Sequence, residues 1–327
     1  PAIGGVGKGQ LVKEVDILGG EMGLAADRTG IQFRRLNASK GPAVHSSRCQ
    51  SDRERYREYM QEVITSQENL KFLEGEAGEI VLVNGRAAGV KLVSGEYFQA
   101  PAVIVTAGTF LNGRIHVGPK ITPGGRADEK PSLDLARNIA DLGFALRNFK
   151  TGTPPRLDGR TIDYSRMLRQ DSDEPPLPFS YRTPCIPPGK KLLPCWITHT
   201  TEETHRIIRE NFHLSPMYSG QIDATGVRYC PSIEDKLKKF GDRQSHHVFL
   251  EPDGLETPIV YPNGISTGLP EDVQEAFVRT IPGLERAEFL RYGYSIEHAV
   301  IYAEELKPTL ESKRIGGLFF AGQVNGT

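Results

Sequence analysis

The chain has 327 residues, with hydrophobic residues at 38% and charged residues at 25%, which is the composition of a soluble globular protein of about two domains. Its 40 Lys and Arg against 41 Asp and Glu give a net charge of −1, which excludes a uniformly basic nucleic-acid coat and an acidic tail but not a local basic face. Four cysteines are too few for a disulfide scaffold and favour a reducing compartment, and no apolar run is long enough to span a bilayer.

The first 66 residues combine glycine-rich loops with two predicted helices. The glycines between Gly4 and Gly9 lack the spacing of a phosphate-binding P-loop and of a dinucleotide fingerprint. This opening is therefore either a loop that contacts some ligand or a plain turn. A short helix is predicted over residues 10–18. A longer one is predicted over residues 52–66, where apolar side chains recur at three- and four-residue steps: Tyr56, Tyr59, Met60, Val63 and Ile64.

A β-meander is predicted next, from strands over residues 79–83, 88–93 and 97–99, with Asn84-Gly85 as the first turn. Residues 102–106 form a continuous apolar run that is typical of a buried parallel strand. We predict that Ser132 caps a helix that ends near residue 142, before Gly143.

Residues 151–195 hold nine of the 23 prolines, which predicts a loop-rich segment suited to a domain boundary or insertion. Helices are predicted beyond it, over residues 201–211, 231–240 and 270–280, the second with Pro231 at its first position. The chain closes on a predicted buried strand over residues 317–322. Strands that end in glycine, at Gly108 and Gly322, are typical of the dinucleotide domains of flavoproteins.

Cys230 is the cysteine with the most suggestive setting, because it precedes a predicted helix N-terminus and lies two residues after Arg228. Both features lower the pKa of a thiol, which suits a nucleophile or an acid. The alternative interpretation is a buried, inert cysteine. No His/Cys spacing indicates zinc, and we predict no metal site. Basic residues gather around residues 34–48, 53–57 and 236–243. These clusters are either solvated faces or a surface that follows a phosphate backbone.

Several sequence blocks, taken together and in this order, are typical of one protein family. Among them are Ala2-Ile3-Gly4-Gly5, Ser39-Lys40-Gly41-Pro42-Ala43-Val44, Lys150-Thr151-Gly152-Thr153-Pro154-Pro155-Arg156, Arg228-Tyr229-Cys230-Pro231-Ser232-Ile233-Glu234-Asp235-Lys236 and Tyr261-Pro262-Asn263-Gly264-Ile265-Ser266-Thr267. From end to end the chain resembles the MnmG (GidA) family.

This resemblance implies a flavin-dependent enzyme of the cytoplasm that modifies tRNA. Together with the GTPase MnmE, in a heterotetramer, such an enzyme adds a carboxymethylaminomethyl or aminomethyl group to C5 of the wobble uridine. The cofactors implied are FAD, NADH and methylene-tetrahydrofolate as the carbon donor. The resemblance also implies a homodimer with no membrane association.

The resemblance also assigns residues to roles. Ala77, Ser132 and Gln323 match positions at the FAD site. Cys230 matches one of the family's functional cysteines and is expected to be catalytic. Residues 226–240 match the nicotinamide dinucleotide segment, and the residues expected to contact that cofactor are Gly226, Arg228, Tyr229, Pro231, Ser232, Glu234, Asp235, Lys236 and Phe240.

The fold expected from this resemblance is α/β, with a two-lobed, Rossmann-like FAD-binding domain interrupted by an inserted α+β domain. Residues 1–150 and 306–327 are assigned to the FAD domain, and residues 151–305 to the inserted NADH and substrate domain. We expect the family's N-terminal βαβ unit and C-terminal helical region to lie outside this sequence, and we therefore expect weak or no FAD retention by the chain alone.

Three other functions remain open. The first is a folate- and FAD-dependent tRNA uridine methyltransferase, which shares the chemistry. The second is a tRNA-binding flavoprotein scaffold without turnover, against which the setting of Cys230 argues. The third is a generic NADH:flavin oxidoreductase.

Overall fold

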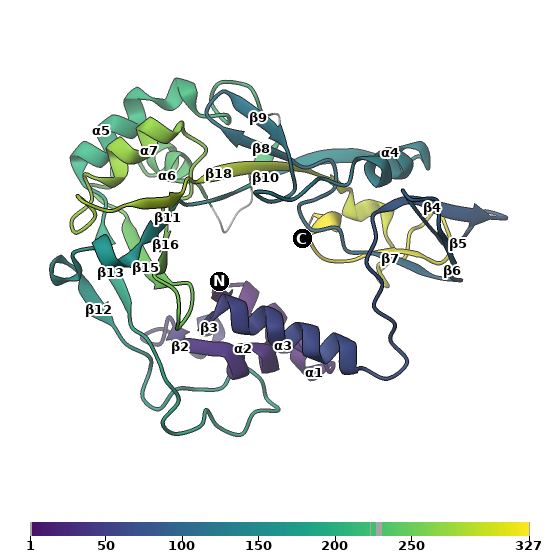
Figure 1. Ribbon diagram of the computed structural model, residues 1–327, viewed down its shortest axis with the longest axis horizontal. Helices are drawn as coiled ribbons and strands as arrows, with labels where there is room; N and C mark the ends of the chain where they lie inside the picture. Colours follow the sequence, from purple (N-terminus) through teal and green to yellow (C-terminus); the bar gives the residue numbers. More distant parts are fainter. Residues whose placement is uncertain (1, 223, 227–230, 327) are drawn as a thin grey trace.

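The computed structural model (Figure 1) describes residues 2–222, 224–226 and 231–326. The predictions made for Arg228, Tyr229 and Cys230 therefore lie outside the described residues.

An N-terminal unit is built on a three-stranded antiparallel sheet in the order β1-β3-β2. Its elements are β1 (Ala2–Gly4), α1 (Lys8–Ile17), α2 (Met22–Thr29), β2 (Gly30–Leu36), β3 (Ser46–Ser51) and α3 (Arg53–Ser66). The predicted helices over residues 10–18 and 52–66 are confirmed. The side chain of Asp52 caps α3 by accepting a hydrogen bond from the backbone N–H of Arg55 at 3.1 Å.

The opening glycine loop of this unit lies directly against other parts of the chain. Gly4 has a φ of +87°, and a Cβ there would lie 2.3 Å from the carbonyl oxygen of Ser47 and 2.8 Å from the ring of Phe179. Glycine is therefore required at this position by close approach to β3 and by the left-handed backbone.

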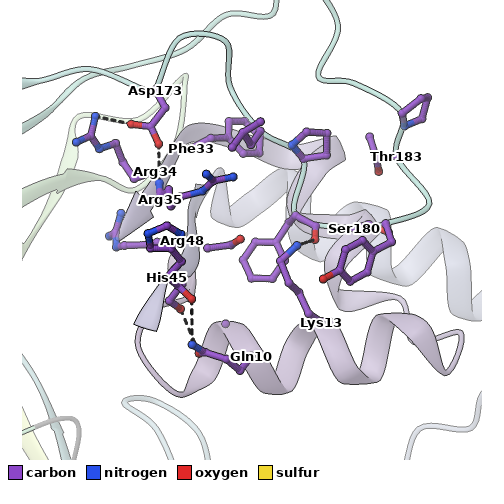
Figure 2. A pocket seen from close by; sticks show the side chains of 18 residues that line it. Gln10, Lys13, Phe33, Arg34, Arg35, His45, Arg48, Asp173, Ser180 and Thr183 are labelled. Carbon is purple, nitrogen blue, oxygen red and sulfur yellow. Dashed lines mark hydrogen bonds and ion pairs between the residues drawn. The ribbon is translucent and has the colours of Figure 1, made fainter. Parts of the chain in front are cut away.

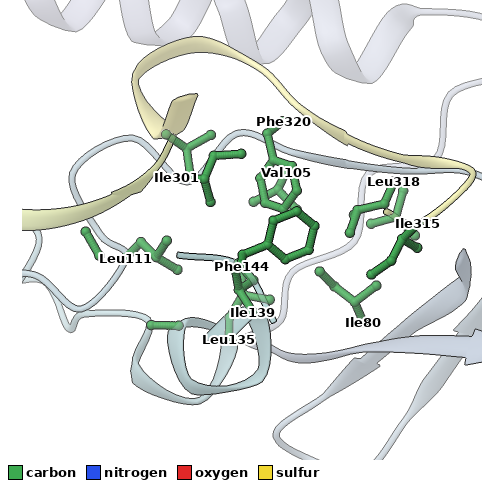
Figure 3. Packing of buried hydrophobic residues seen from close by; sticks show 14 of the residues in the cluster. Ile80, Val105, Leu111, Leu135, Ile139, Phe144, Ile301, Ile315, Leu318 and Phe320 are labelled. Carbon is green, nitrogen blue, oxygen red and sulfur yellow. The ribbon is translucent and has the colours of Figure 1, made fainter. Parts of the chain in front are cut away.

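The meander and the parallel strand pair form a second unit around one core (Figure 3). Asn84 and Gly85 have φ values of 51° and 73°, as a tight hairpin turn requires. Buried apolar side chains such as Ile139, Phe144 and Phe320 fill the space between the helix and the strands. The elements are β4 (Ala77–Val83), β5 (Arg86–Leu92), β6 (Tyr97–Gln99), β7 (Val103–Val105), α4 (Leu133–Asp141) and β19 (Leu318–Phe320), of which β7 and β19 pair in parallel.

A five-stranded sheet connects this unit to the rest of the molecule. Its order is β14 (Thr225–Gly226), β10 (Leu146–Thr153), β18 (Tyr294–Ile301), β8 (Arg114–Val117) and β9 (Lys120–Pro123). Strands β10 and β18 pair antiparallel from Leu146 to Thr153, and Figure 1 shows them running side by side from α7 towards α4. The boundary predicted between residues 150 and 151 falls inside β10. Strands from both sides of that boundary therefore share one sheet.

A six-stranded sheet with three helices forms the third unit, around its own apolar core. The strand order is β12 (Leu168–Gln170), β13 (Cys195–His199), β15 (His247–Pro252), β16 (Ile259–Asn263), β11 (Arg156–Asp158) and β17 (Phe289–Arg291). The helices are α5 (Glu202–Glu210), α6 (Ile233–Lys239) and α7 (Glu271–Val278). The short 3₁₀ helices of the chain are η1 (Pro42–Val44), η2 (Gly159–Thr161), η3 (Tyr164–Arg166), η4 (Phe212–Leu214), η5 (Ala303–Glu305) and η6 (Gly322–Asn325).

The segment predicted to be loop-rich, residues 151–195, is so only in its second part: residues 151–170 hold the end of β10, the strands β11 and β12, and η2 and η3, whereas residues 171–194 contain no helix or strand. This long segment packs on the N-terminal unit. The backbone N–H of Leu193 donates to the carbonyl of Ile31 at 2.8 Å, and Phe179 and Ile186 are buried in the same cluster as Phe33. The segment therefore ties the six-stranded sheet to the N-terminal unit.

Candidate functional site

A cavity of about 800 Å³ lies where β7 ends, beside α4 and the meander. Its lining includes Ala77 and Ser132, together with Ile80, Val105 and Thr106. The fold thus brings together two residues that are 55 positions apart in the sequence and that were both predicted to contact FAD. The size of the cavity is that of a small-molecule site.

Parallel pairing of β7 with β19 builds this end of the cavity. Val105 lies opposite Phe320, and the backbone N–H of Ala321 donates to the carbonyl of Val105 at 3.0 Å. Both strands therefore end at the same edge, where α/β proteins bind their ligands. Gln323, the third predicted FAD residue, follows β19 in η6 and is absent from the lining of the cavity.

The prediction that the side chain of Ser132 caps α4 is wrong. Ser132 holds the N-cap position, but its hydroxyl makes no capping hydrogen bond, and its ψ of 89° differs from the usual cap geometry. Its backbone is engaged instead, since its N–H donates to the carbonyl of Phe110 at 2.8 Å. The strand-like pairing of Ser132 with Leu111 therefore sets the backbone here, and Ser132 is among the residues that line the cavity.

The charged side chains that line the cavity are mostly acidic. They are Glu74, Glu76 and Glu129, against Lys130 alone. The negative charge of a pyrophosphate would be repelled by these carboxylates, whereas a neutral adenosine would not be repelled. The ribose hydroxyl groups of the adenosine can also donate hydrogen bonds to carboxylates. The cavity therefore suits a neutral, polar-edged group better than a phosphate.

The predicted helix over residues 231–240 begins later than expected. The helix α6 starts at Ile233, with Ser232 as its N-cap, so the prediction of Pro231 at the first helical position is wrong. The Ser232 hydroxyl accepts from the N–H of Asp235 at 3.2 Å, while the Asp235 carboxylate accepts from the N–H of Ser232 at 3.1 Å. This reciprocal capping box already satisfies the first turn of the helix.

Asp235 also joins α6 to the five-stranded sheet. Its carboxylate lies 3.7 Å from the Nζ of Lys150 on β10 and accepts a hydrogen bond from the hydroxyl of Tyr218 at 2.8 Å. Burial opposes ionisation of Asp235, but Lys150, Tyr218 and Ser232 outweigh it and hold the pKa of this carboxyl below its usual value. Lys150 is itself buried, so the pair fixes the start of α6 relative to β10.

Other residues predicted to contact the dinucleotide also have protein partners. Glu234 is 1% exposed, and its Oε1 accepts from the hydroxyls of Ser215 and Thr267. The Nζ of Lys236 donates to the carbonyl of Gly264 at 2.7 Å. Phe240 is half exposed at the C-terminal end of α6. Gly226 belongs to β14, where its backbone pairs with that of Lys150 on β10. A cofactor role for this segment stays a prediction.

Sequence reasoning missed a buried polar cluster on the five-stranded sheet. Glu297 on β18 accepts from the amide of Asn148 on β10 at 2.8 Å and lies 3.2 Å from the ring of His116 on β8. Burial lowers the pKa of His116, against the opposing effect of Glu297. The available signal was the polar residues inside β18, a strand whose eight residues are all buried. These polar residues can be recognised as a buried cluster only when the strands beside β18 are known.

His298, next to Glu297, predicts a pH-dependent stability. Both ring nitrogens are buried without a hydrogen-bond partner among the described residues, and burial lowers the pKa of His298 to about 4, from 6.5. Between these values the unfolded chain binds more protons than the folded chain. The free energy of unfolding should therefore rise with pH across this window, by at most about 1.4 kcal/mol per pH unit for one such group.

We expect His298→Leu to flatten this slope, measured by urea unfolding between pH 4 and 7. Part of the slope should remain, because the pKa of buried His246 is also lowered to about 4. His213 is exposed, so His213→Leu is the control and should keep the slope of the unmodified protein. Equal slopes for His298→Leu and the unmodified protein would contradict this account of His298.

Two of the three predicted basic clusters, around residues 34–48 and 53–57, are partly neutralised by acidic partners. Arg34 pairs with Asp173 at 2.7 Å, Arg48 with Glu251 at 2.6 Å, and Arg57 with Glu54. These arginines therefore contribute less net charge to their surfaces than the sequence suggests. Within the described ranges, no group of three His, Cys, Asp or Glu residues is placed to hold a metal ion, and no helix is long and apolar enough to cross a membrane.

The fold and this cavity define an α/β protein with a cavity of small-molecule size at the ends of a parallel strand pair. The model of the family described as glucose inhibited division protein A matches residues 1–327. The chain belongs to this family.

Two curated relatives are each called a tRNA uridine 5-carboxymethylaminomethyl modification enzyme MnmG. The protein from Syntrophotalea carbinolica is 52% identical over 327 residues, covering 100% of this chain and 52% of the relative. The protein from Thermodesulfovibrio yellowstonii is 53% identical over 327 residues, again covering 100% of this chain and 52% of the relative. The chain thus spans about half the length of these relatives.

Solved structures agree with this assignment. The structure of Aquifex aeolicus GidA in its form I crystal superposes with a TM-score of 0.94 at 51% identity, covering 100% of this chain and 55% of that one. The form II crystal gives a TM-score of 0.92 at 50% identity, with coverage of 100% and 53%. These likenesses support the α/β fold over the whole described chain.

Proposed function

We propose that this chain is part of a flavin-dependent enzyme that modifies the wobble uridine of tRNA at C5. The reaction adds a carboxymethylaminomethyl or aminomethyl group, with MnmE as partner GTPase, NADH as reductant and methylene-tetrahydrofolate as carbon donor. The observation that carries this proposal is 52% identity, across all 327 residues, to a curated enzyme of that name. Location in the cytoplasm, a homodimer and a heterotetramer with MnmE are part of the same proposal.

The cavity at the end of β7 fits one part of FAD. Its acidic lining disfavours the pyrophosphate, and its neutral walls around Ala77, Ile80 and Ser132 suit the adenosine end. In this assignment Ala77 and Ser132 would line the site of the adenosine, while Gln323 lies in η6, beyond the end of β19. When bound, the flavin supplies a hydride acceptor and donor.

The pair formed by Lys150 and Asp235 supports the dinucleotide segment. By fixing Ser232 and the start of α6 against β10, it holds the backbone directly after Cys230 in the sequence. The role that we assign to Lys150 and Asp235 is therefore positional. The NADH contacts predicted for the rest of the segment, from Gly226 to Phe240, belong to the same proposal.

Cys230 is the proposed catalytic residue, because C5 of uridine is a weak nucleophile. A thiolate that adds to C6 forms a C–S bond and shifts the electrons of the C5–C6 double bond onto the C4 carbonyl, giving an enolate. The enolate carbon C5 can then attack an electrophilic one-carbon unit. Loss of the C5 proton and expulsion of the thiolate would restore the double bond. In the alternative version, Cys230 is a proton donor in the same reaction.

The test is a reconstitution with nucleoside analysis. The full-length protein is incubated with its partner GTPase, NADH, methylene-tetrahydrofolate, GTP, a nitrogen donor (glycine or ammonium) and unmodified tRNA, and the digested nucleosides are identified by mass spectrometry. A C5 modification at the wobble position supports the proposal. A methylated uridine elsewhere indicates the folate-dependent methyltransferase instead, and unchanged tRNA with flavin-dependent NADH oxidation indicates a generic oxidoreductase.

Replacing the proposed nucleophile should remove activity. We expect Cys230→Ser to lower kcat by at least about 100-fold, because a neutral serine hydroxyl is a far weaker nucleophile than a thiolate. The matched control is Cys185→Ser, since Cys185 is a free, exposed cysteine and should tolerate the change with full activity. Full modification by Cys230→Ser would exclude both the nucleophile and the proton-donor role.

A further inference from the structure

A second cavity lies in the N-terminal unit, between α1, strands β2 and β3, and the irregular segment around residues 173–184 (Figure 2). Its volume is about 530 Å³, and it shares no lining residue with the cavity at the end of β7. It is therefore a separate site, to which the proposed function assigns no role. Its walls come from sequence segments more than 120 positions apart, so it exists only in the folded chain.

The cavity is lined by two cations that form no short ion pair among the residues that the structure describes. Arg34 and Arg48, which also line it, are paired with Asp173 and Glu251 at 2.7 and 2.6 Å. Lys13 and Arg35, by contrast, have no carboxylate within 4.0 Å among the residues that the structure describes. Only the backbone N–H of Arg35 is engaged, donating to Asp173 at 2.6 Å, and Figure 2 shows the side chain extending into the cavity.

Lys13 is held in place across the cavity from Arg35. Its Nζ donates to the carbonyl of Phe179 at 2.7 Å and lies 4.4 Å from the centre of the Tyr181 ring. Burial lowers the pKa of Lys13, Asp27 and Asp16 raise it in part, and Arg35 has the smallest effect and lowers it. Lys13 and Arg35 both line the cavity. Two like charges that face one space are relieved by an anion between them.

The remaining walls indicate what the anion is attached to. The exposed residues Leu177 and Tyr181 provide apolar and aromatic surface. The hydroxyl of Ser46 already donates to the carbonyl of Gly5, and that of Thr183 is hydrogen-bonded to Asp27. An exposed aromatic side chain favours a planar ring, and two cations favour a multiply charged oxyanion such as phosphate. The volume lies within the range of sites for nucleotide-sized molecules.

We propose that this cavity binds a small aromatic phosphate ester of nucleotide size, with its phosphate between Lys13 and Arg35 and its ring against Leu177 and Tyr181. The binding is separate from the wobble-uridine chemistry, and neither proposal depends on the other. A phosphate is assigned because Lys13 and Arg35 come from different elements and approach the space from two sides.

The probe is pyridoxal 5′-phosphate, an aromatic phosphate whose aldehyde reports on the lysine beside its site. The neutral amine of Lys13 and the aldehyde form an imine and release water, and added borohydride supplies the hydride that fixes the adduct. Full-length protein is treated at limiting probe, and labelled lysines are quantified by peptide mass spectrometry. We expect Lys13 to be labelled about tenfold more than Lys8 and Lys40, which are exposed nearby, as an anion site and a lowered pKa require.

Two variants and two competitors make the outcome decisive. Arg35→Gln should lower labelling of Lys13 by about tenfold through the lost phosphate contact. Arg57→Gln removes an exposed arginine paired with Glu54 and should leave the labelling unchanged. Adenosine 5′-monophosphate should protect Lys13 at lower concentration than inorganic phosphate. Equal labelling of all three lysines, insensitivity to Arg35→Gln, or protection by tRNA but not by the mononucleotide would each overturn the proposal.

Discussion

Replacing Phe320 by alanine is expected to lower the free energy of unfolding by about 3–5 kcal/mol, the usual cost of truncating a buried aromatic side chain. Phe320 has no exposed surface, and its ring centre lies 5.2 Å from that of Phe144 in an edge-to-face arrangement. Because its strand, β19, pairs with β7 at the candidate cofactor cavity, the cavity should lose shape as well. Urea unfolding of the full-length protein measures the first effect, and flavin titration the second.

Phe72→Ala is the matched control for this prediction. Phe72 is 66% exposed, so its truncation should change the free energy of unfolding by less than about 0.5 kcal/mol. A loss below about 1.5 kcal/mol for Phe320→Ala would show that the core between α4 and β19 repacks or contributes little.

Lys150→Met is the second large effect, with an expected destabilisation of about 3–5 kcal/mol at pH 7, because it leaves a largely buried carboxylate without its cation. Lys150 is 3% exposed, and its Nζ lies 3.7 Å from Asp235. In the unmodified protein the pKa of Asp235 is lowered, so its stabilising contribution is present at neutral pH and disappears as the pH falls through that lowered pKa.

Loss of Lys150 should raise the pKa of Asp235. The destabilisation should therefore shrink in acid, as Asp235 in the variant takes up a proton and its unpaired charge disappears. Urea unfolding at pH 7 and near pH 4 distinguishes this charge effect from a simple packing loss, which would be the same at both values.

A double-mutant cycle completes this test. The double variant Lys150→Met with Asp235→Asn should be less destabilised than the sum of the single variants, because it removes both charges of the pair. Lys91→Met is the surface control, since Lys91 and Glu79 are half exposed and 4.0 Å apart, and it should cost less than about 1 kcal/mol. Exact additivity in the cycle would mean that Lys150 and Asp235 do not stabilise each other.

Local elements were predictable where the signal lies within a short stretch of sequence. The turn at Asn84-Gly85 needs two residues that tolerate positive φ, and α3 needs Asp52 as its cap and an apolar stripe at helical spacing. Both are decided by neighbours in sequence. The prediction of Ser132 as a capping side chain failed because pairing of its backbone with Leu111, a tertiary contact, set its conformation instead.

The candidate sites were predictable only in part. Resemblance placed Ala77 and Ser132 at one cofactor, and the fold brings both to one cavity, although Gln323 does not line it. Nothing in the sequence pairs Lys150 with Asp235 or Glu297 with His116, because these partners lie 85 and 181 positions apart. Likewise, the sequence does not predict that Lys13 and Arg35 line one cavity, because this depends on how α1 packs against β2.

By itself, the sequence determined the family, the α/β class and most of the local elements, since these follow from motif order, hydrophobic period and turn chemistry. Tertiary structure alone decided that β10 and β18 share a sheet across the predicted boundary, and that segments near residues 9–48 and 173–184 enclose a second cavity. The physical reason is that burial and charge compensation depend on which distant residues meet in space. The cost of an unpaired charge appears only when its surroundings have been assembled.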